Sequence, residues 1–498
     1  MVLSEVLEGT GAALDAVTAS LEIAGITHDS RRVRPAFAFF ALTGRMADGH
    51  SYAADAMKHG AAACICERRI EGLPLPQVVL PNARRALAFA AANFYGNPQR
   101  RMRLVGVTGT NGKTSTAYML KTIFSHGGYK TALLGTAKGS IGDAAYTPPL
   151  DAAEADEYET MTTPDPEVLY RTLADLAARG VEVTVMEASS HALALDKLAP
   201  IEFALGIFTN LSHEHLDFHG SMENYLAAKA KLFDSCRVGL FNADDAAGRT
   251  LLQNAKCRAV SYGLTPPCDY LAEEIESYGV RGSSYLLHTR GARFRVKTQI
   301  PGSFTLYNTL AAAAAARECG VDLVCIQNAL YALRGIAGRL EKVNLGFMGG
   351  AFTVFIDYAH TPFALENLLR CVRAFRGTGQ RIVTLFGCGG ARDREKRPEM
   401  GRIAVENSDF VILTSDNPRA EEPQAILADI LKGVGKADNY TVIENRREAI
   451  EYAVANALAG DIILLVGKGH EQYEIDKDGL HPFSETEIVQ EAAERYRS

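Results

Sequence analysis

Residues 104–124 read LVGVTGTNGKTSTAYMLKTIF, and this stretch decides the fold of the 498-residue chain. An apolar strand leads into a glycine-containing loop at 109–115, and a helix follows. Glycines let successive backbone N–H groups curl around phosphate oxygens, and a helix N-terminus adds partial positive charge. Lys113 can reach the terminal phosphates and Thr114 can hold magnesium. The stretch predicts a phosphate-binding loop, although Val107 stands where the general pattern has its first glycine.

Strand-like and helical runs alternate on both sides of this loop, which is typical of α/β layers. Three blocks emerge: residues 1–102, 103–337 and 338–498. The Gly-Asn-Pro at 96–98 stops a helix and makes a linker after the first block. In the third block five or six strand–helix units predict a doubly wound, mostly parallel sheet, with its site at the carboxyl ends of the strands. We therefore predict an α/β protein of three domains, with a central P-loop ATPase-like sheet and a C-terminal Rossmann-like sheet.

Composition excludes several classes of protein. The net charge is −7, from 52 basic and 59 acidic side chains, so electrostatics give no case for a nucleic-acid partner. No stretch is long and apolar enough for a membrane span, and the N-terminus lacks the basic region and apolar core of a signal peptide. We expect a soluble cytoplasmic monomer that binds small molecules.

Nine cysteines are spread along the chain without a repeated CxxC spacing. Cys64 and Cys66 form a CxC in a strand-like run, where alternation along a buried strand explains them better than a metal site. The others are typical of small core residues in a reducing compartment.

Two segments after the phosphate loop carry groups suited to magnesium. Glu187 ends the strand-like run VTVME, and a carboxylate at a strand's end beside a P-loop is well placed for the ion. Residues 209–220, TNLSHEHLDFHG, hold three histidines and two acids without HExxH or CxxC. A polar loop linked to magnesium fits this segment better than zinc, and His215 is the expected direct ligand.

Lys229 shares the apolar face of a helical run with Tyr225, Leu226, Leu232 and Phe233. Burial lowers the pKa of a lysine, and a neutral amine can add carbon dioxide to become a carbamate, an anionic metal ligand. On the residues alone, a lysine that extends along the helix face to water is the more common interpretation. A P-loop by itself also leaves the reaction open among a kinase, a switch GTPase, a transporter motor and a ligase.

The chain resembles the Mur ligases over nearly its whole length. The motifs that carry the resemblance are TGTNGKTS at 108–115, MEASSHAL at 186–193, TNLSHEHLDFHG at 209–220, YNTLAA at 307–312, AGRLE at 337–341, DYAHTP at 357–362, FGCGGARDREKRPEMG at 386–401, SDNPRAEEP at 415–423 and GKGHEQYE at 467–474. Their order is most similar to that in members that add the third residue of the peptidoglycan stem peptide. The resemblance implies an ATP-dependent amide ligase of peptidoglycan precursor synthesis, and thus a role in cell-wall growth, shape and division.

The resemblance also assigns residues to the nucleotide and the first substrate. For ATP it implies Gly109, Thr110, Asn111, Gly112, Lys113, Thr114, Ser115, Asn308, Arg339, Asp357 and His360. For the UDP-N-acetylmuramoyl dipeptide it implies Ser30, Arg45, Met46, Ala47, Thr162, Thr163, Ser189 and Lys197. Lys229 falls on the family's carbamylated lysine, which reverses the interpretation from the helix face alone. Thr114 and Glu187 are then expected to hold one magnesium ion, and His215 and the Lys229 carbamate a second.

The third substrate is indicated by the sequence Asp416-Asn417-Pro418-Arg419. In this family DNPR marks members that choose meso-diaminopimelate, whose distal carboxylate, absent from lysine, a guanidinium can clamp with two hydrogen bonds. Further contacts to the amino acid are implied for Arg392, Gly467 and Glu471. The catalytic residues implied are Lys113, Glu187, His215 and Lys229.

Two alternatives remain. A sister enzyme could add L-lysine or act on folate, although Arg419 disfavours lysine and the UDP-binding-like first block disfavours folate. A nucleotide-dependent switch without catalysis is the alternative from another class, but it leaves DNPR and GKGHE unexplained.

Overall fold

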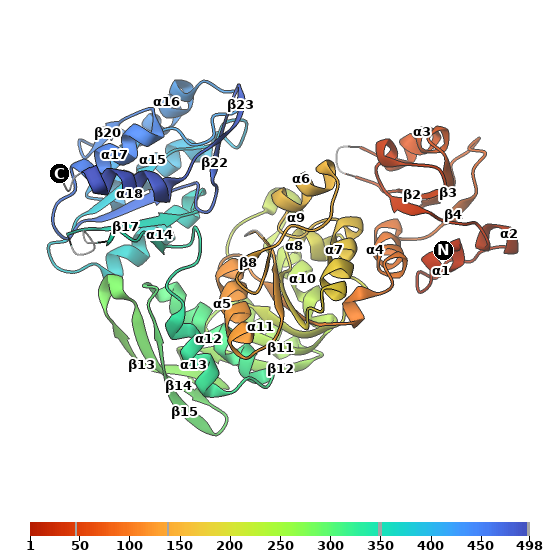
Figure 1. Cartoon of the computed structure of the whole chain (residues 1–498), viewed down its shortest axis with the longest axis horizontal. Coiled ribbons are helices and arrows are strands. Elements are labelled where there is room, and N and C mark those ends of the chain that lie inside the picture. The colour runs from red at the N-terminus through yellow and green to blue at the C-terminus, as the bar shows by residue number, and fades with distance from the viewer. Residues whose placement is uncertain (45–46, 137–138, 347–350, 496–498) are drawn as a thin grey trace. The chain divides into compact units, whose positions relative to one another are not determined.

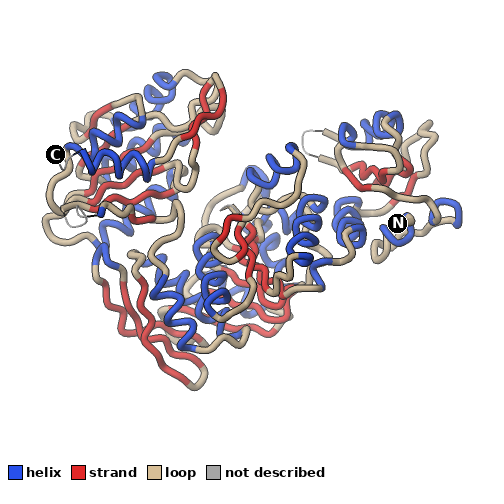
Figure 2. Tube along the Cα trace, in the orientation of Figure 1, coloured by secondary structure: helices blue, strands red, loops and turns tan. Residues whose placement is uncertain are grey.

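The structure, a computed structural model, describes residues 1–44, 47–136, 139–346 and 351–495. The chain divides into two compact units, Met1–Leu271 with Leu310–Ile326, and Ala272–Thr309 with Gln327–Ser498. Helices and strands alternate along both units, as Figure 1 and Figure 2 show. The predicted α/β class is confirmed.

A four-stranded parallel sheet opens the first unit, with its strands in chain order. Its strands are β1 (Gly25–Thr27), β2 (Phe37–Ala41), β3 (Ala61–Cys66) and β4 (Gln77–Val79). The helices of this block are α1 (Leu3–Val6), α2 (Ala16–Ala19), α3 (Ala53–Lys58) and α4 (Ala83–Phe94), with 3-10 turns η1 (Ser30–Arg32), η2 (Gly49–Tyr52) and η3 (Pro98–Arg100). Cys64 and Cys66 are fully buried in β3, as their place in a strand predicts.

A larger sheet forms the centre of the first unit, where its strands run in the order β12-β11-β10-β5-β9-β6-β7-β8. The strands are β5 (Arg103–Thr108), β6 (Thr131–Leu134), β7 (Ser140–Ile141), β8 (Ala144–Ala145), β9 (Val183–Glu187), β10 (Phe203–Phe208), β11 (Cys236–Asn242) and β12 (Arg258–Gly263). The helices are α5 (Lys113–His126), α6 (Ala152–Thr160), α7 (Pro166–Ala178), α8 (Ser190–Ala194), α9 (Leu216–His219), α10 (Met222–Asp234) and α11 (Ala246–Asn254). β13 (Tyr270–Ser277) starts in this unit, beside β12.

Parallel pairing in this sheet brings three chain segments to one edge. Thr108 pairs with Phe208, and Val107 pairs with Glu187, so β5, β9 and β10 end together. All six residues of β5 except Arg103 are buried, because helices cover both faces of a parallel sheet. The phosphate loop, Glu187 and the segment after Phe208 therefore start from neighbouring points.

The second unit carries a β-hairpin and a six-stranded sheet. The hairpin is β14 (Ser283–Thr289) with β15 (Ala292–Thr298), near the 3-10 turn η4 (Gly279–Arg281). The sheet, in the order β16-β17-β21-β18-β19-β20, contains β16 (Glu341–Lys342), β17 (Thr353–Asp357), β18 (Ile382–Phe386), β19 (Phe410–Leu413), β20 (Tyr440–Val442) and β21 (Ile462–Val466). The helices are α14 (Pro362–Phe375), α15 (Lys396–Asn407), α16 (Pro423–Val434), α17 (Arg446–Ala455) and α18 (Glu485–Arg495), and β22 (Tyr473–Asp476) pairs with β23 (Gly479–Pro482). Helices α12 (Ser303–Glu318) and α13 (Leu323–Ala332) each contribute residues to both units.

The six-stranded sheet is covered by helices on both faces. In β21, Ile462, Leu464 and Val466 pack in one core with α14, α15 and α16. Ile463 and Leu465 point the other way and pack with α17 and α18. This alternation explains why the strand IILLV is apolar throughout. The predicted doubly wound sheet is confirmed, and all its pairs are parallel except that of the short edge strand β16.

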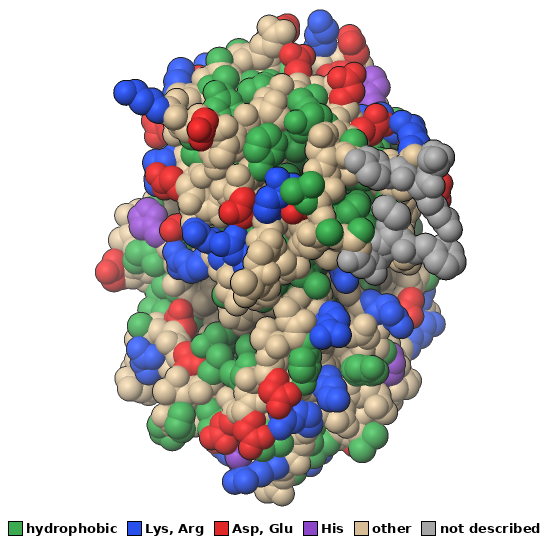
Figure 3. Space-filling view, turned by 90° about the vertical axis from the view of Figure 1, so that its left-hand side faces the viewer, with side chains coloured by type: hydrophobic (Ala, Val, Ile, Leu, Met, Phe, Trp, Pro, Cys, Tyr) green, Lys and Arg blue, Asp and Glu red, His purple; other side chains and the backbone are tan. Residues whose placement is uncertain are grey.

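The charge distribution on the surface and the hydropathy of the helices are those of an ordinary folded protein. On the face in Figure 3, basic and acidic side chains are interspersed and neither sign gathers alone. Among the residues described, no helix is long and apolar enough to cross a membrane.

Candidate active site

The phosphate loop joins β5 to α5 and depends on two glycines. Gly109 has a φ of 146°, and a Cβ there would lie 1.9 Å from Oγ1 of Thr209. Gly112 has a φ of 82° and caps the N-terminus of α5, so it adopts a conformation that favours glycine. The helix then begins at Lys113 with its first backbone N–H groups directed to the loop, which is the arrangement that binds phosphate.

A second segment, which follows β10, holds the phosphate loop in place. Thr209 Oγ1 donates to the carbonyl oxygen of Asn111 at 2.6 Å, and Asn210 accepts from the N–H of Asn111 at 3.0 Å through its side-chain oxygen. The N–H of Thr110 donates to the carbonyl oxygen of Asn210 at 2.9 Å. The start of TNLSHEHLDFHG is thus part of the loop's support.

Two lysines converge on the same backbone oxygen. Lys113 Nζ donates to the carbonyl oxygens of Gly109 (3.1 Å) and Thr110 (2.8 Å), and Lys229 Nζ donates to that of Gly109 at 2.7 Å. Lys229 is only 1% exposed and its amine lies 4.3 Å from the ring centre of Tyr225. Its amine does not extend to water, so that alternative is excluded. Burial, with the nearby charge of Lys113, holds the pKa of Lys229 well below its usual value.

Glu187 stands at the centre of a buried oxygen cluster. Thr114 Oγ1 donates to its carboxylate at 3.1 Å, and the N–H of Thr136 donates at 2.9 Å. Glu187 is 1% exposed, and a Cβ at Gly135 would lie 2.3 Å from its carboxylate. Carboxylate and hydroxyl oxygens are the hard donors that magnesium prefers, so Thr114 and Glu187 fit that ion.

Three histidines cluster beside the phosphate loop: His215 and His219 lie against Tyr225, and His191 lies against both of these histidines. His215, at the start of α9, has a φ of 56°, and its ring meets that of His191 edge-on at 4.9 Å. Burial lowers the pKa of His215, and burial with the charge of His215 lowers the pKa of His191 to about 4. A neutral imidazole is the form that binds metals. Within the described residues, no group of three or more His, Cys, Asp or Glu side chains is arranged to hold a metal ion.

The C-terminal sheet brings three further loops together at its carboxyl edge, after β18, β19 and β21. Asn417 is buried; its side-chain N–H donates to Glu471 at 2.8 Å and its oxygen accepts from Lys468 Nζ at 2.8 Å. Gly467 has a φ of 116°, and a Cβ there would lie 2.6 Å from the carboxylate of Asp416. Arg419 donates from its guanidinium to the carbonyl oxygen of Gly390 at 3.0 Å.

Comparison with known proteins identifies this arrangement. The chain matches the Mur ligase family, catalytic domain, over residues 22–95, the Mur ligase middle domain over 107–316, and the Mur ligase, glutamate ligase domain over 338–469. The chain belongs to the Mur ligase family.

Full-length relatives agree with the family models. A protein of Clostridium tetani named UDP-N-acetylmuramoyl-L-alanyl-D-glutamate–2,6-diaminopimelate ligase is 40% identical over 478 residues, 95% of each chain. A solved structure of an enzyme with that name has a TM-score of 0.71 and 31% identity, and the match covers 100% of this chain and 99% of that one. Folylpolyglutamate synthase of Mycobacterium tuberculosis, solved with ADP and AMPPCP, shares the fold at a TM-score of 0.62 and 20% identity, over 83% of this chain and 95% of that one.

The residues expected at the muramoyl dipeptide of this Mur ligase fall into two groups. Arg45 and Met46 lie outside the described residues; Ala47 follows them, and Ser30 begins η1. The second group adjoins the phosphate site.

Thr162 and Thr163 in this second group both connect to Glu187. Thr162 Oγ1 lies 3.0 Å from Oγ1 of Thr136, which contacts the carboxylate, and Thr163 Oγ1 donates to the Glu187 carbonyl oxygen at 2.9 Å. The N–H of Ser189 donates to Thr163 Oγ1 at 3.1 Å. Lys197 is buried and pairs with Asp165 at 2.6 Å.

Four expected nucleotide residues belong to the second unit. Asp357, at the end of β17, accepts the N–H groups of Leu340 (2.7 Å) and Ala359 (2.9 Å), and burial raises its pKa. Arg339 lies over the ring of Tyr358, with its guanidinium carbon 5.1 Å from the ring centre. His360 Nδ1 lies 2.8 Å from the carbonyl oxygen of Tyr358, and Asn308 is buried in α12.

The sequence analysis did not identify several residues that the structure places at or near the site. Thr136 contacts Glu187 from a separate strand end. Lys468 is fully buried although it stands between two glycines in GKGHE, and its position two residues after a buried strand is a signal that could have found it. Arg446 is 2% exposed and donates to the carbonyl oxygens of Ser415 and Val466, both at 3.1 Å, so it ties the roots of two site loops together.

Proposed function

We propose that this Mur ligase adds meso-diaminopimelate to UDP-N-acetylmuramoyl-L-alanyl-D-glutamate and converts ATP to ADP and phosphate. A D-glutamyl carboxylate oxygen attacks the γ-phosphorus of ATP, and ADP leaves. The amine nitrogen of diaminopimelate then attacks the carbon of the acyl phosphate. Phosphate leaves, the amine loses a proton and an amide forms. The full-length match to ligases named for 2,6-diaminopimelate carries this proposal.

The phosphate loop supports the first step. Backbone N–H groups at the start of α5 bind phosphate oxygens, and Lys113 moves from the carbonyl oxygens of Gly109 and Thr110 to the anion. Such fixed donors act mainly by position and charge. Thr114 and Glu187 would hold one magnesium ion, which neutralises phosphate charge when bound.

Lys229 supports a second ligand set. Its buried amine, with a carbonyl acceptor and a lowered pKa, is suited to carbamate formation, in which the nitrogen lone pair attacks carbon dioxide and a proton leaves. His215 and Lys229 both lie beside Tyr225. The ring centres of His215 and Tyr225 are 6.1 Å apart, and the Lys229 amine lies over the Tyr225 ring. We propose that the His215 imidazole and the Lys229 carbamate hold a second magnesium ion.

The loops of the C-terminal sheet support recognition of the amino acid. Arg419 and the exposed Arg392 provide guanidinium groups for the distal carboxylate, since planar donors clamp carboxylates with two hydrogen bonds. Glu471, oriented by Asn417, provides a carboxylate for an ammonium group. Gly467 allows the close approach of Asp416 beneath the ligand.

We also propose that the domains divide after residues 102 and 337. The protein is proposed to be a monomer located in the cytoplasm. All nine cysteines are free thiols, which supports a reducing compartment.

The test is phosphate release from ATP and magnesium with the UDP-muramoyl dipeptide, measured with meso-diaminopimelate, with L-lysine and without amine. We expect turnover that requires the dipeptide and strongly favours diaminopimelate. A preference for lysine would overturn the amine assignment, and turnover indifferent to dipeptide and amine would favour a nucleotide switch.

A further inference from the structure

Two residues of the amino-acid loops have a backbone conformation that side chains disfavour. Ala391 has a φ of 52° and Arg419 a φ of 54°, both in the left-handed region. Residues other than glycine persist there only when surrounding contacts impose the conformation. Ala391 directly precedes Arg392, and Arg419 is the arginine of DNPR. The backbone strain therefore lies next to or at the two arginines proposed to bind the amino acid.

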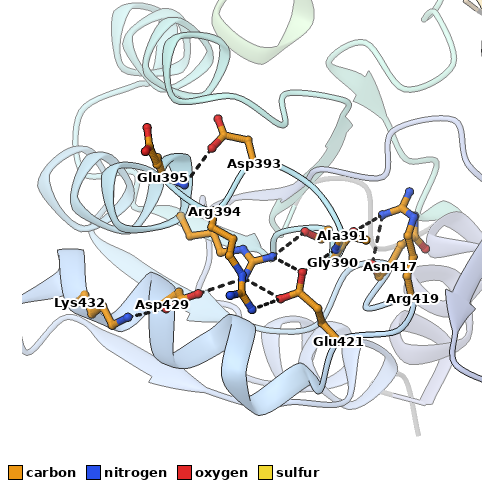
Figure 4. Close-up of polar contacts among 12 residues, drawn as sticks. Gly390, Ala391, Asp393, Arg394, Glu395, Asn417, Arg419, Glu421, Asp429 and Lys432 are labelled. Atoms are coloured by element: carbon orange, nitrogen blue, oxygen red, sulfur yellow. Dashed lines mark hydrogen bonds and ion pairs between the residues drawn. The ribbon is translucent and has the colours of Figure 1, made fainter. Parts of the chain in front are cut away.

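The carboxylate of Glu421 supplies the contacts for the first of these positions. It accepts the N–H of Ala391 at 2.6 Å, the Arg394 guanidinium at 2.8 Å, and two N–H groups of Arg397 at 3.0 and 3.1 Å. Figure 4 shows Glu421 directed from the DNPR side toward the turn with Gly390 and Ala391. One side chain thus holds the turn after β18.

Arg397 holds the Glu421 carboxylate in place. Its side chain is fully buried, and it also donates to Asp429 at 3.0 Å and to the carbonyl oxygen of Gly389 at 3.3 Å. The contacts with Arg397, then Arg394, then the N–H of Ala391 lower the pKa of Glu421 to about 2. Glu421 therefore stays ionised in the physiological range.

The same turn sets the place of Arg419. Gly390 accepts the Arg419 guanidinium at 3.0 Å, and its N–H donates to the carbonyl oxygen of Asn417 at 2.9 Å. A Cβ at Gly390 would lie 1.9 Å from the carbonyl oxygen of Pro418, so the two loops are in direct backbone contact. A shift of the turn at 389–392 would displace both arginines.

We propose that Glu421 is a positioning residue that sets the spacing of Arg392 and Arg419 and thereby the preference for a second carboxylate on the amino acid. This inference rests on the proposed function and adds a determinant of specificity to it. Glu421 acts through the turn, not by contact with the substrate.

The test uses the full-length enzyme and steady-state kinetics with each substrate varied in turn. Glu421→Gln keeps the shape of the side chain but removes the charge and replaces one acceptor by a donor. We expect the KM for meso-diaminopimelate to rise about tenfold, since 1.4 kcal/mol corresponds to a factor of ten and a charged hydrogen bond has at least that strength. The KM values for ATP and the UDP-muramoyl dipeptide should change less than twofold, and kcat less than threefold. The adjacent, exposed Glu422→Gln is the matched control and should leave all values unchanged.

A rescue separates positioning from general damage. Ala391→Gly in the Glu421→Gln background should return the KM for diaminopimelate to within about threefold of wild type, because glycine adopts a positive φ without strain. A fall in the amount of folded enzyme alone would lower the rate at every substrate concentration and leave the KM unchanged.

Four results would overturn the inference: an unchanged KM for diaminopimelate, an equal rise in all three KM values, a changed KM in Glu422→Gln, or no rescue. If Glu421→Gln does not fold, Arg394→Ala carries the test, because Arg394 is exposed and binds the same carboxylate. Its KM for diaminopimelate should rise about threefold, and no rise would contradict the proposal. Failure of wild type to use diaminopimelate would instead refute the proposed function.

Discussion

Lys229 in the first unit and Arg446 in the second are both basic side chains removed from water, with exposures of 1% and 2%. Lys229 donates to the carbonyl oxygen of Gly109, whereas Arg446 lies 2.8 Å from the carboxylate of Glu485. Burial lowers the pKa of Lys229, but for Arg446 the attraction of Glu485 outweighs burial and raises the pKa. Arg446, neutralised by the Glu485 carboxylate, serves the fold, whereas Lys229, which donates to a carbonyl oxygen, remains available to an anion or to chemical modification.

The largest effect expected from this contrast is on stability. Arg446→Met leaves the Glu485 carboxylate buried without its partner, so the free energy of unfolding should fall by about 3–5 kcal/mol. Urea unfolding of the full chain measures this change. Arg447→Met is the control, because Arg447 is exposed and its pair with Glu491 contributes less than about 1 kcal/mol. Equal effects of the two variants would break the contrast.

Lys229→Met should have the opposite profile. It removes the amine proposed to carry the carbamate ligand of the second magnesium ion, so kcat should fall about 100- to 1000-fold, while the free energy of unfolding changes by less than about 1 kcal/mol. Kinetics and urea unfolding on the same preparation give both values. Lys231→Met, two residues along α10 and half-exposed, should keep kcat within about threefold of wild type. A loss of stability as large as that of Arg446→Met would place Lys229 among the structural cations.

Arg419 extends the contrast to the amino-acid loops, since its guanidinium donates to carbonyl oxygens of Gly390 and Asn417. Arg419→Met should therefore raise the KM for meso-diaminopimelate about 10- to 100-fold, the range of a charged hydrogen bond of 1.5–3 kcal/mol. Its effect on stability should stay within about 1 kcal/mol. The matched control is Arg402→Met, an exposed arginine paired with Glu406 on a helix surface. An unaltered KM in Arg419→Met would contradict the role of DNPR.

The smallest effect concerns His28, whose ring lies 2.7 Å from Glu167. The charge of Glu167 raises the pKa of His28 to about 9, against a usual value of 6.5. Because the pKa is higher in the folded state, the stabilisation is complete below pH 6.5 and is lost as the pH rises through about 9. His28→Gln should cost about 1–2 kcal/mol at pH 6, a value reduced from the full shift because the ring is a third exposed.

Thermal unfolding at pH 6 to 10 tests this prediction. The difference between wild type and His28→Gln should close at the alkaline end, and His126→Gln at an exposed helix end should show no such trend. A difference independent of pH would mean that packing, not charge, holds His28.

The outcome of the sequence analysis depended on how far apart the interacting residues are in the chain. The phosphate loop was predictable because strand, glycines, Lys113 and helix are consecutive. The burial of Lys229 agreed with its helix face, but its acceptor, Gly109, lies 120 residues away. The hairpins β14–β15 and β22–β23 were not anticipated, because pairing between strands depends on packing more than on local preference.

The amino-acid loops show the limit most clearly. DNPR named the arginine by resemblance, yet nothing near Glu421 in the chain indicates that it binds the turn at Ala391. Arg446 and Glu485 are 39 residues apart, and each lies in a polar stretch typical of a surface, ENRRE at 444–448 and SETE at 484–487.

By itself, the sequence determined the α/β class, the phosphate loop, the family and the chemical types of the groups available for ligation. Those properties follow from local periodicity, backbone preferences and contiguous motifs. Only the tertiary structure decided which cations meet carboxylates and which meet carbonyl oxygens. The parallel sheets bring the ends of distant strands to one edge. Side chains that meet there are buried, so the group within hydrogen-bond distance determines the charge state of each, and with it stability and function.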